Sequence, residues 1–538
     1  MNIKSANSIQ DVYPLSPMQE GMLFHALLDE DADHYFLQYT YHLRGKLNIG
    51  CIERSLKALM KRYDILRTVF LHEGYDRSLQ VVLQERKAAF YHKDVRKEVL
   101  ESDRDTVVDR YRQLDRAHKF NLSKDVLMRL KVYRTGEEDY DFVWSFHHIL
   151  MDGWCTSIII NEFGILYEGY LEGRQVRLPV VEPYSTYIKW LEAQDKEMSR
   201  QYWRKYLSGY ENLASISMDK TDVSGFKYAS SSLLLSKERT RNLKTISGDL
   251  GVTLYTLLQS AWGILLSRYN NVTDVVFGSV VSGRPSQLKG VERMVGLFIN
   301  TIPVRITYQQ GDSIAHLLHQ VQENAAESNP YHYHLLSEVQ KLSGLGKALL
   351  DHIIIFENYL VSNEIEDVSD ESLQASQMEV TGVKVFEHTS YDLTIVIQPG
   401  DELLIKFDYN VNKYDAQCIE RLVGYLSLIL AYIERDVNLP ISKMDITTPD
   451  DRQLYKTFND TSADYPRDQT LIALFEEQVQ KTPASTALIY EDHELSYEAL
   501  DARSNQLSRS LLERGCCPGM VVGLMVDRSI EMMVGMLA

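Results

Sequence analysis

Apolar and polar positions recur along most of this chain in two rhythms, one with the period of a helix and one with the period of a strand. Because both rhythms occur in each half of the chain, the pattern predicts a mixed α/β fold of α+β character. Helices are expected at residues 16–28, 51–63, 254–269 and 416–434. Strands are expected at residues 36–43, 67–71, 141–146, 274–281, 353–356, 393–397 and 403–407, the last two as a hairpin.

The strand expected at residues 141–146 is followed by apolar residues at helical spacing from Ile158 to Tyr167. The segment between them is therefore a short loop that leads from a strand directly into a helix. Alternation places Phe142, Trp144, Phe146 and His148 on one face of the extended segment, and Val143, Ser145 and His147 on the other. The two neighbouring histidines therefore point in opposite directions.

Interruptions of the pattern divide the chain into segments. Glycine and proline interrupt it at residues 171–184, which we interpret as the connection between two lobes of similar make-up. An acidic run at residues 362–376 is expected to be a solvated loop. The expected segments are residues 1–10 (a frayed end or part of a docking site), 11–180 (first lobe), 181–445 (second lobe), 446–465 (a polar linker) and 466–538 (a tail with helices at 471–480 and 497–514 around a strand at 486–490).

Length and composition exclude several classes of protein. A chain of 538 residues is too long for one hydrophobic core. Its 57 basic and 75 acidic side chains give a net charge of −18, which argues against nucleic acid as a partner. The five cysteines have neither metal-ligand spacing nor the pattern of a disulfide framework. With no apolar core of a signal peptide after Met1 and no apolar run of membrane-spanning length, we expect a cytoplasmic protein without membrane contact.

Residues 147–153 have the sequence His-His-Ile-Leu-Met-Asp-Gly, which is typical of an acyl-transfer site. One imidazole can face a substrate as a base or hydrogen-bond partner, while the other is held in the packing. Asp152 can fix the loop through an arginine, and Gly153 allows close approach of the backbone. The alternative is a chance pair of core histidines on a strand.

This motif and four further blocks, in the same order, resemble condensation domains of nonribosomal peptide synthetases, which are relatives of chloramphenicol acetyltransferase. The blocks lie at residues 16–25, 62–70, 184–190 and 295–301, and the resemblance covers roughly residues 10–445. It implies two chloramphenicol acetyltransferase-like lobes in a V shape. A sixth block, at residues 330–335, departs from the family, which usually has a proline near Leu335. Residues 495–500 resemble the first motif of adenylation domains, so the tail is expected to be the truncated N-terminal part of such a domain.

The resemblance implies peptide-bond formation between a donor peptidyl or aminoacyl thioester and the α-amine of an acceptor aminoacyl thioester. Both substrates would arrive on phosphopantetheine arms of carrier proteins, and the domain itself would bind neither cofactor nor metal. Because Met1 lies so close to the first block, the donor carrier is expected on a separate polypeptide, with the acceptor carrier downstream. Residues 13–25 resemble the subtype that takes a D-configured donor and an L-configured acceptor. The rival interpretations are an epimerisation domain and an inactive condensation-like scaffold that recruits a partner enzyme.

Within this reaction the site residues receive distinct roles. His148 is expected to take up the amine proton, or to act by positioning the amine and stabilising charge, and His147 is expected to be structural. Gly153 either offers a backbone N–H to the developing oxyanion or only permits close approach. Asp152 is expected to form a buried ion pair rather than to transfer a proton. Its expected partner is Arg284, with Arg62 and Arg67 as rivals.

Overall fold

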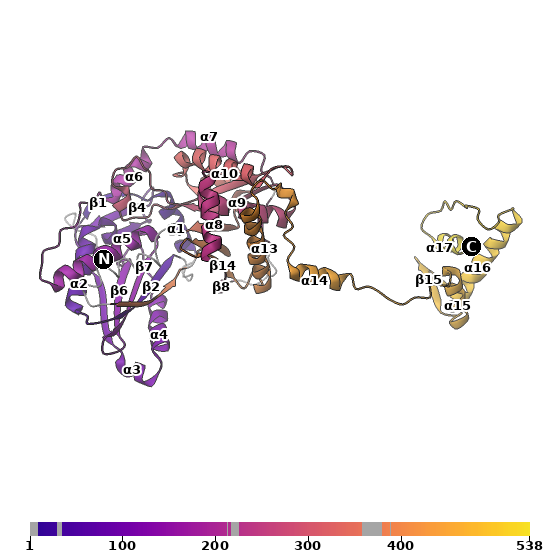
Figure 1. Ribbon diagram of the computed structural model, residues 1–538, viewed down its shortest axis with the longest axis horizontal. Coiled ribbons are helices and arrows are strands. Elements are labelled where there is room, and N and C mark those ends of the chain that lie inside the picture. The colour runs from indigo at the N-terminus through magenta and orange to yellow at the C-terminus, as the bar shows by residue number, and fades with distance from the viewer. Residues whose placement is uncertain (1–8, 29–34, 212, 217–224, 358–378, 388) are drawn as a thin grey trace. The chain divides into compact units, whose positions relative to one another are not determined.

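The computed structural model describes residues 9–28, 35–211, 213–216, 225–357, 379–387 and 389–538. These residues form two units, one ending at Thr448 and one beginning at Pro449 (Figure 1). The expected acidic loop at residues 362–376 and most of the expected N-terminal segment lie outside the described residues. The mixed α/β fold class expected from the sequence is confirmed.

The first unit contains a five-stranded sheet in which β7, the strand that leads to the histidine pair, is central. The strand order is β12 (Glu379–Phe386), β2 (Phe36–Arg44), β7 (Asp139–His147), β6 (Met128–Arg134) and β5 (Ala89–Asp94). A smaller sheet beside it has the order β1 (Ile9–Pro14), β4 (Leu79–Leu83) and β3 (Thr68–Leu71). The helices in this part of the chain are α1 (Pro17–Leu28), α2 (Ile49–Arg62), α3 (Arg96–Glu101), α4 (Arg104–Ala117), α5 (Gly153–Leu171), α6 (Tyr184–Glu192) and α7 (Lys196–Tyr206).

The two faces of β7 are both buried, against different partners. Phe142, Trp144 and Phe146 belong to the main apolar core around this sheet, together with residues of α2 and α5. Val143 faces the opposite side, in a small cluster with residues of α3 and α4. The alternation expected from the sequence is thus present, and it fixes the direction in which each histidine leaves the strand.

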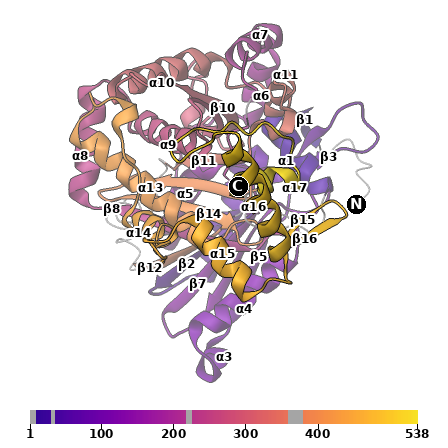
Figure 2. The ribbon, with the colours of Figure 1, turned by 90° about the vertical axis from the view of Figure 1, so that its right-hand side faces the viewer.

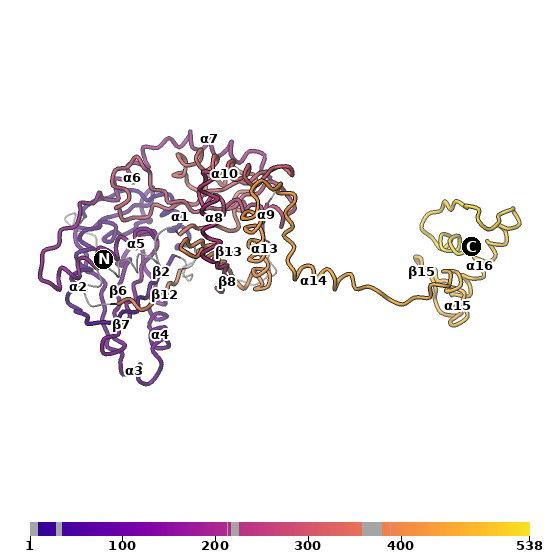
Figure 3. Tube along the Cα trace, viewed as in Figure 1, coloured from indigo at the N-terminus to yellow at the C-terminus, as the bar shows by residue number. Residues whose placement is uncertain are grey.

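A second, six-stranded sheet carries the other large core of the first unit. Figure 3 traces the backbone of this part of the chain in magenta to orange. Its order is β10 (Asn300–Thr307), β9 (Asp274–Val281), β11 (His352–Phe356), β13 (Leu393–Gln398), β14 (Leu403–Asn410) and β8 (Tyr228–Leu235). Only β11 runs parallel to its neighbours. The helices of this part are α8 (Lys237–Asp249), α9 (Leu254–Asn270), α10 (Ile314–Ser328), α11 (Leu336–Leu342) and α13 (Ala416–Arg435).

Helix α13 is, by length and composition, apolar enough to cross a membrane, which the sequence analysis did not anticipate. One face of this helix, including Ile419, Leu422 and Leu426, is buried in the core of the second sheet. That burial is the ordinary behaviour of an amphipathic core helix in a globular protein.

Segments from beyond residue 181 pack against the first sheet, so the boundary drawn from the sequence does not separate two independent cores. Strand β12 pairs antiparallel with β2 and completes the first sheet (Figure 2). The side chains of Tyr184 and Tyr187 on α6, and of Leu297 and Phe298 before β10, also belong to the first core. These crossings position residues of the second half of the chain at the histidine loop.

The second unit is small. It contains α14 (Pro449–Phe458), α15 (Leu471–Lys481), β15 (Thr486–Tyr490), β16 (His493–Ser496), α16 (Tyr497–Glu513) and α17 (Ile530–Leu537). Helix α14 falls where the sequence predicted a polar linker, and none of its residues is buried. The core of this unit centres on Leu500, Ile530 and Val534.

Candidate functional site

The histidine pair lies where β7 ends and the chain turns toward α5. The backbone N–H of His148 donates to the carbonyl oxygen of Tyr35 (2.8 Å), which holds the turn against the entry to β2. Gln19 on α1 donates from Nε2 to the carbonyl oxygen of Ile149 (3.0 Å), and its own side chain is fully buried. The loop is therefore held by two other segments of the first unit.

His147 is the last residue of β7 and is buried. Its Nδ1 accepts a hydrogen bond from the backbone N–H of Ile149 (3.1 Å). Burial, and secondly the neighbouring His148, lower the pKa of His147 to about 3. The side chain is thus neutral near pH 7 and satisfies a buried backbone donor inside the motif loop.

His147→Ala is expected to lower the free energy of unfolding by about 1–3 kcal/mol, because it leaves the Ile149 N–H without a partner. Since the folded state favours neutral His147, this contribution is complete above pH 6.5 and is lost as the pH falls toward 3. The difference in free energy of unfolding between wild type and variant should therefore become smaller in acid. Tryptophan fluorescence during unfolding measures it, because all five tryptophans lie before residue 263 and report on the first unit. A difference in free energy of unfolding that grows in acid would contradict the role of neutral His147 as a hydrogen-bond acceptor.

His148 is buried with 9% of its surface exposed, and burial lowers its pKa. The imidazole is therefore neutral near pH 7 and one of its nitrogens can accept a proton. Its Nε2 lies 3.6 Å from Oε1 of Glu387, the residue that follows β12. Its Nδ1 is buried and has no hydrogen-bond partner among the described residues.

Asp152 caps the N-terminus of α5 and is almost fully buried. Its Oδ1 accepts hydrogen bonds from the backbone N–H of Cys155 (3.2 Å) and from Nη2 of Arg284 (3.3 Å). Its Oδ2 accepts the backbone N–H of Phe298 (3.1 Å). The guanidinium carbon of Arg284 also lies 4.0 Å from the centre of the Phe298 ring. One carboxylate thus joins the motif loop to two segments from the second half of the chain.

The start of α5 has further links to the same region. Cys155 Sγ donates to the carbonyl oxygen of Gly296 (3.2 Å), and burial raises the pKa of this thiol to about 12, which keeps it neutral. Trp154 donates from Nε1 to the carbonyl oxygen of Glu292 (3.0 Å). Gly153, between these residues and Asp152, is the buried first residue of α5. Together these contacts fix the direction in which α5 leaves the loop.

Of the three arginines considered as partners of Asp152, only Arg284 contacts it. Arg62 forms a two-bonded ion pair with Glu162 (2.8 and 2.9 Å). Arg67 pairs with Asp64 (2.6 Å) and donates to a nearby backbone carbonyl. Both arginines are therefore paired with other carboxylates, and neither is the partner of Asp152.

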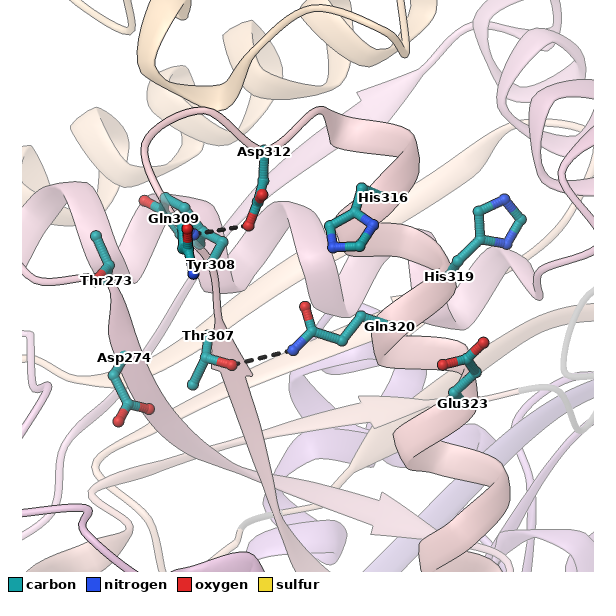
Figure 4. A pocket seen from close by; sticks show the side chains of 10 residues that line it. All are labelled: Thr273, Asp274, Thr307, Tyr308, Gln309, Asp312, His316, His319, Gln320 and Glu323. Carbon is teal, nitrogen blue, oxygen red and sulfur yellow. Dashed lines mark hydrogen bonds between the residues drawn. The ribbon is translucent and has the colours of Figure 1, made fainter.

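One cavity lies away from this loop, at the ends of β9 and β10 beside α10 (Figure 4). It has a volume of about 650 Å³, and His148 is not among its lining residues. His316, His319 and Glu323 of α10 face it, but no group of three metal-binding side chains suited to a metal ion occurs in the described part of the chain. The chemistry of the histidine loop and this cavity are therefore separate features.

Comparison with known families divides the chain a short way after the boundary between its two units. Residues 9–455 match the model of the condensation domain, and residues 475–538 match that of an AMP-binding enzyme. Bacitracin synthase 3 of Bacillus licheniformis is 41% identical over 99% of this chain and 8% of its own length. Gramicidin S synthase 2 of Brevibacillus brevis is 39% identical over 98% of this chain and 12% of its own length. The chain thus spans about a tenth of these relatives.

Solved structures show the same fold at lower identity. A holo four-domain nonribosomal peptide synthetase bound to AMP and glycine matches all of this chain, and 41% of that one, with a TM-score of 0.74 and 20% identity. The starter condensation domain of rhizomide synthetase matches over 82% of this chain and 100% of its own, with a TM-score of 0.68 and 17% identity. At these identities the likeness concerns the fold alone.

Proposed function

The chain belongs to the condensation-domain family of nonribosomal peptide synthetases, and from this premise we propose that it forms a peptide bond between two carrier-bound thioesters. The donor is a peptidyl or aminoacyl thioester, and the acceptor is an aminoacyl thioester that supplies its α-amine. Both are delivered on phosphopantetheine arms of carrier proteins.

The observation that carries this proposal is that the histidine motif is complete and that its loop is held in place by several hydrogen bonds. All of its fixed residues are present, and the loop is held from three sides by Gln19, by the Asp152–Arg284 pair and by the Phe298 N–H. Because His148 is neutral near pH 7, it is able to accept a proton. An intact motif held in this way supports an active domain over a condensation-like scaffold, which is expected to have a degraded motif.

The residues act in the proposed reaction as follows. The lone pair of the acceptor amine attacks the donor carbonyl carbon, and the carbonyl oxygen takes the negative charge of a tetrahedral intermediate. His148 takes a proton from the nitrogen as the C–N bond forms. The intermediate collapses, the C–S bond breaks, and the proton passes to the leaving thiolate. Holding two tethered reactants in line contributes up to about 7–11 kcal/mol to the lowering of such a barrier. The N–H of Gly153 is the proposed donor to the oxyanion.

The test is condensation by the purified chain, with one loaded carrier protein as donor and one as acceptor. Appearance of the dipeptidyl product on the acceptor carrier supports the proposal. No product with either donor configuration supports an inactive scaffold instead. Exchange of the donor α-proton with solvent, without amide formation, identifies an epimerisation domain.

We further propose that the donor is D-configured at its reacting residue and the acceptor L-configured, from the resemblance of residues 13–25 to that subtype. A D-aminoacyl donor carrier is expected to be used at least about tenfold faster than its L-isomer, which corresponds to about 1.4 kcal/mol between the two transition states. Parallel assays with both donors and one L-acceptor measure this ratio. Equal rates or an L-preference contradict the subtype and leave the condensation reaction intact.

A further inference from the structure

Strand β12 brings a carboxyl group to the histidine loop. It pairs with β2 in an antiparallel register in which Phe386 lies opposite Gln38, and β2 pairs in turn with β7 (Figure 2). The chain leaves β12 at Glu387, beside the end of β7 where the motif begins. This carboxyl group thus comes from the second half of the chain and lies beside His148.

The distance between Glu387 and His148 suits a group placed between them. Oε1 of Glu387 lies 3.6 Å from Nε2 of His148, which is too long for a good direct hydrogen bond. A single charged nitrogen can donate to both acceptors at about 2.7–2.9 Å from each once the two atoms separate by roughly 1 Å more. When Glu387 is ionised, the pair therefore offers two acceptors to one incoming donor.

The surroundings of Glu387 favour a cation. Burial, and then the carboxylates of Glu357 and Asp408, raise the pKa of Glu387 to about 8. The titratable groups that act on it electrostatically are these two carboxylates and the hydroxyl of Tyr39, and the imidazole of His148 lies 3.6 Å away. No lysine or arginine forms an ion pair with Glu387 in the part of the chain that the structure describes. A carboxyl group so placed is stabilised when a positive charge arrives.

We propose that Glu387 and His148 together bind the α-amine of the acceptor, with Glu387 as a second catalytic residue. This inference rests on the proposed condensation reaction. The incoming ammonium gives one proton to Glu387 in its ionised form, which makes up a growing fraction as the pH rises toward 8, and becomes a neutral amine whose lone pair attacks the thioester carbon. A second proton passes from the same nitrogen to Nε2 of His148 and then to the leaving thiolate. The amide keeps the third, and Glu387 returns its proton to solvent.

The proton affinities of the two groups agree with this step. An α-amine has a pKa of about 7.7–8.0, close to that of Glu387, so proton transfer between them is nearly balanced. A carboxylate with the ordinary pKa of 4.5 would be a much weaker base toward the ammonium. The raised pKa thus supports the role that the geometry assigns.

The test compares Glu387→Gln with Glu379→Gln, which removes an exposed carboxylate at the other end of β12. With saturating donor, Glu387→Gln is expected to raise the KM for the acceptor about tenfold and to lower kcat about 100-fold. The KM for the donor and the kinetics of Glu379→Gln should remain within about twofold of wild type. Glu387→Asp, which keeps the carboxylate, should retain more activity than Glu387→Gln.

Glu387→Gln is expected to fold. The raised pKa of Glu387 means that the folded state favours its neutral form, so the ionised carboxyl group destabilises the protein increasingly from pH 4.5 up to 8. Glutamine resembles the neutral form, and the variant should unfold at or above the wild-type temperature at pH 8. Fluorescence of the five tryptophans follows this transition.

A second measurement uses the wild type alone. The competitor is pantetheine carrying a glycolyl group, in which a hydroxyl replaces the amine of glycyl-pantetheine. With glycyl-pantetheine as the substrate, the inhibition constant of this competitor is expected to be at least about tenfold higher than that of an amine-bearing acceptor. Equal competition, or an acceptor KM unchanged in Glu387→Gln, overturns the role of Glu387. An inactive wild type would instead overturn the proposed condensation reaction.

Discussion

His148→Ala is expected to lower the rate of peptide-bond formation by at least about 100-fold, and by up to about 10⁴-fold if the imidazole carries all of the proton transfer. The neutral ring lies at the start of the fixed loop with Nε2 3.6 Å from Oε1 of Glu387, and alanine provides no proton acceptor there. Single-turnover condensation between two loaded carriers measures the chemical step apart from product release.

The fold should survive this substitution with a smaller loss of stability than in His147→Ala. The ring of His148 makes no side-chain hydrogen bond within the described residues, whereas His147 satisfies the N–H of Ile149. The two alanine variants are therefore matched controls for each other. His147→Ala should keep its rate per folded molecule, and His148→Ala should keep its fold. A near wild-type rate in folded His148→Ala would show that the proton leaves the amine by another route.

The sequence predicted the central elements of this fold because their patterns are strong and local. The predicted strand at residues 274–281 coincides with β9, and the predicted directions of Phe146 and Val143 are those of β7. Both strands are buried, so their composition is nearly sufficient to identify them. The crossing strand β12 was missed because several of its side chains are exposed and its partner β2 lies more than 300 residues earlier.

The sequence predicted which types of residue form the site, but it predicted their contacts less well. A buried aspartate requires a cation or several donors, and this requirement led to Arg284 together with Arg62 and Arg67. The choice among them depended on which arginine already had a nearby carboxylate, and that is a property of the folded chain. Glu387 has no motif around it, and only the pairing of β12 with β2 brings it to His148.

Asp152→Asn is expected to lower the free energy of unfolding of the first unit by about 3–5 kcal/mol, as is usual when one member of a buried ion pair is removed. The side-chain amide of asparagine has one oxygen that accepts hydrogen bonds, whereas the carboxylate of Asp152 has two. Its amide N–H groups would then face the Arg284 guanidinium and the Cys155 N–H, or the Phe298 N–H, all of which are donors. The rate of condensation should fall together with the stability, because the loop that carries His148 loses its link to the second half of the chain.

A double-mutant cycle with Arg284→Met separates this structural role from a chemical one. Because the two side chains share one contact, the double variant should be more stable than the sum of the single effects by about 0.5–3 kcal/mol. Unfolding followed by tryptophan fluorescence gives all four free energies from the same unit. Strictly additive effects would contradict the ion pair. If Asp152→Asn kept the wild-type melting temperature and lost condensation, while Arg284→Met kept both, Asp152 would take part in the chemistry itself.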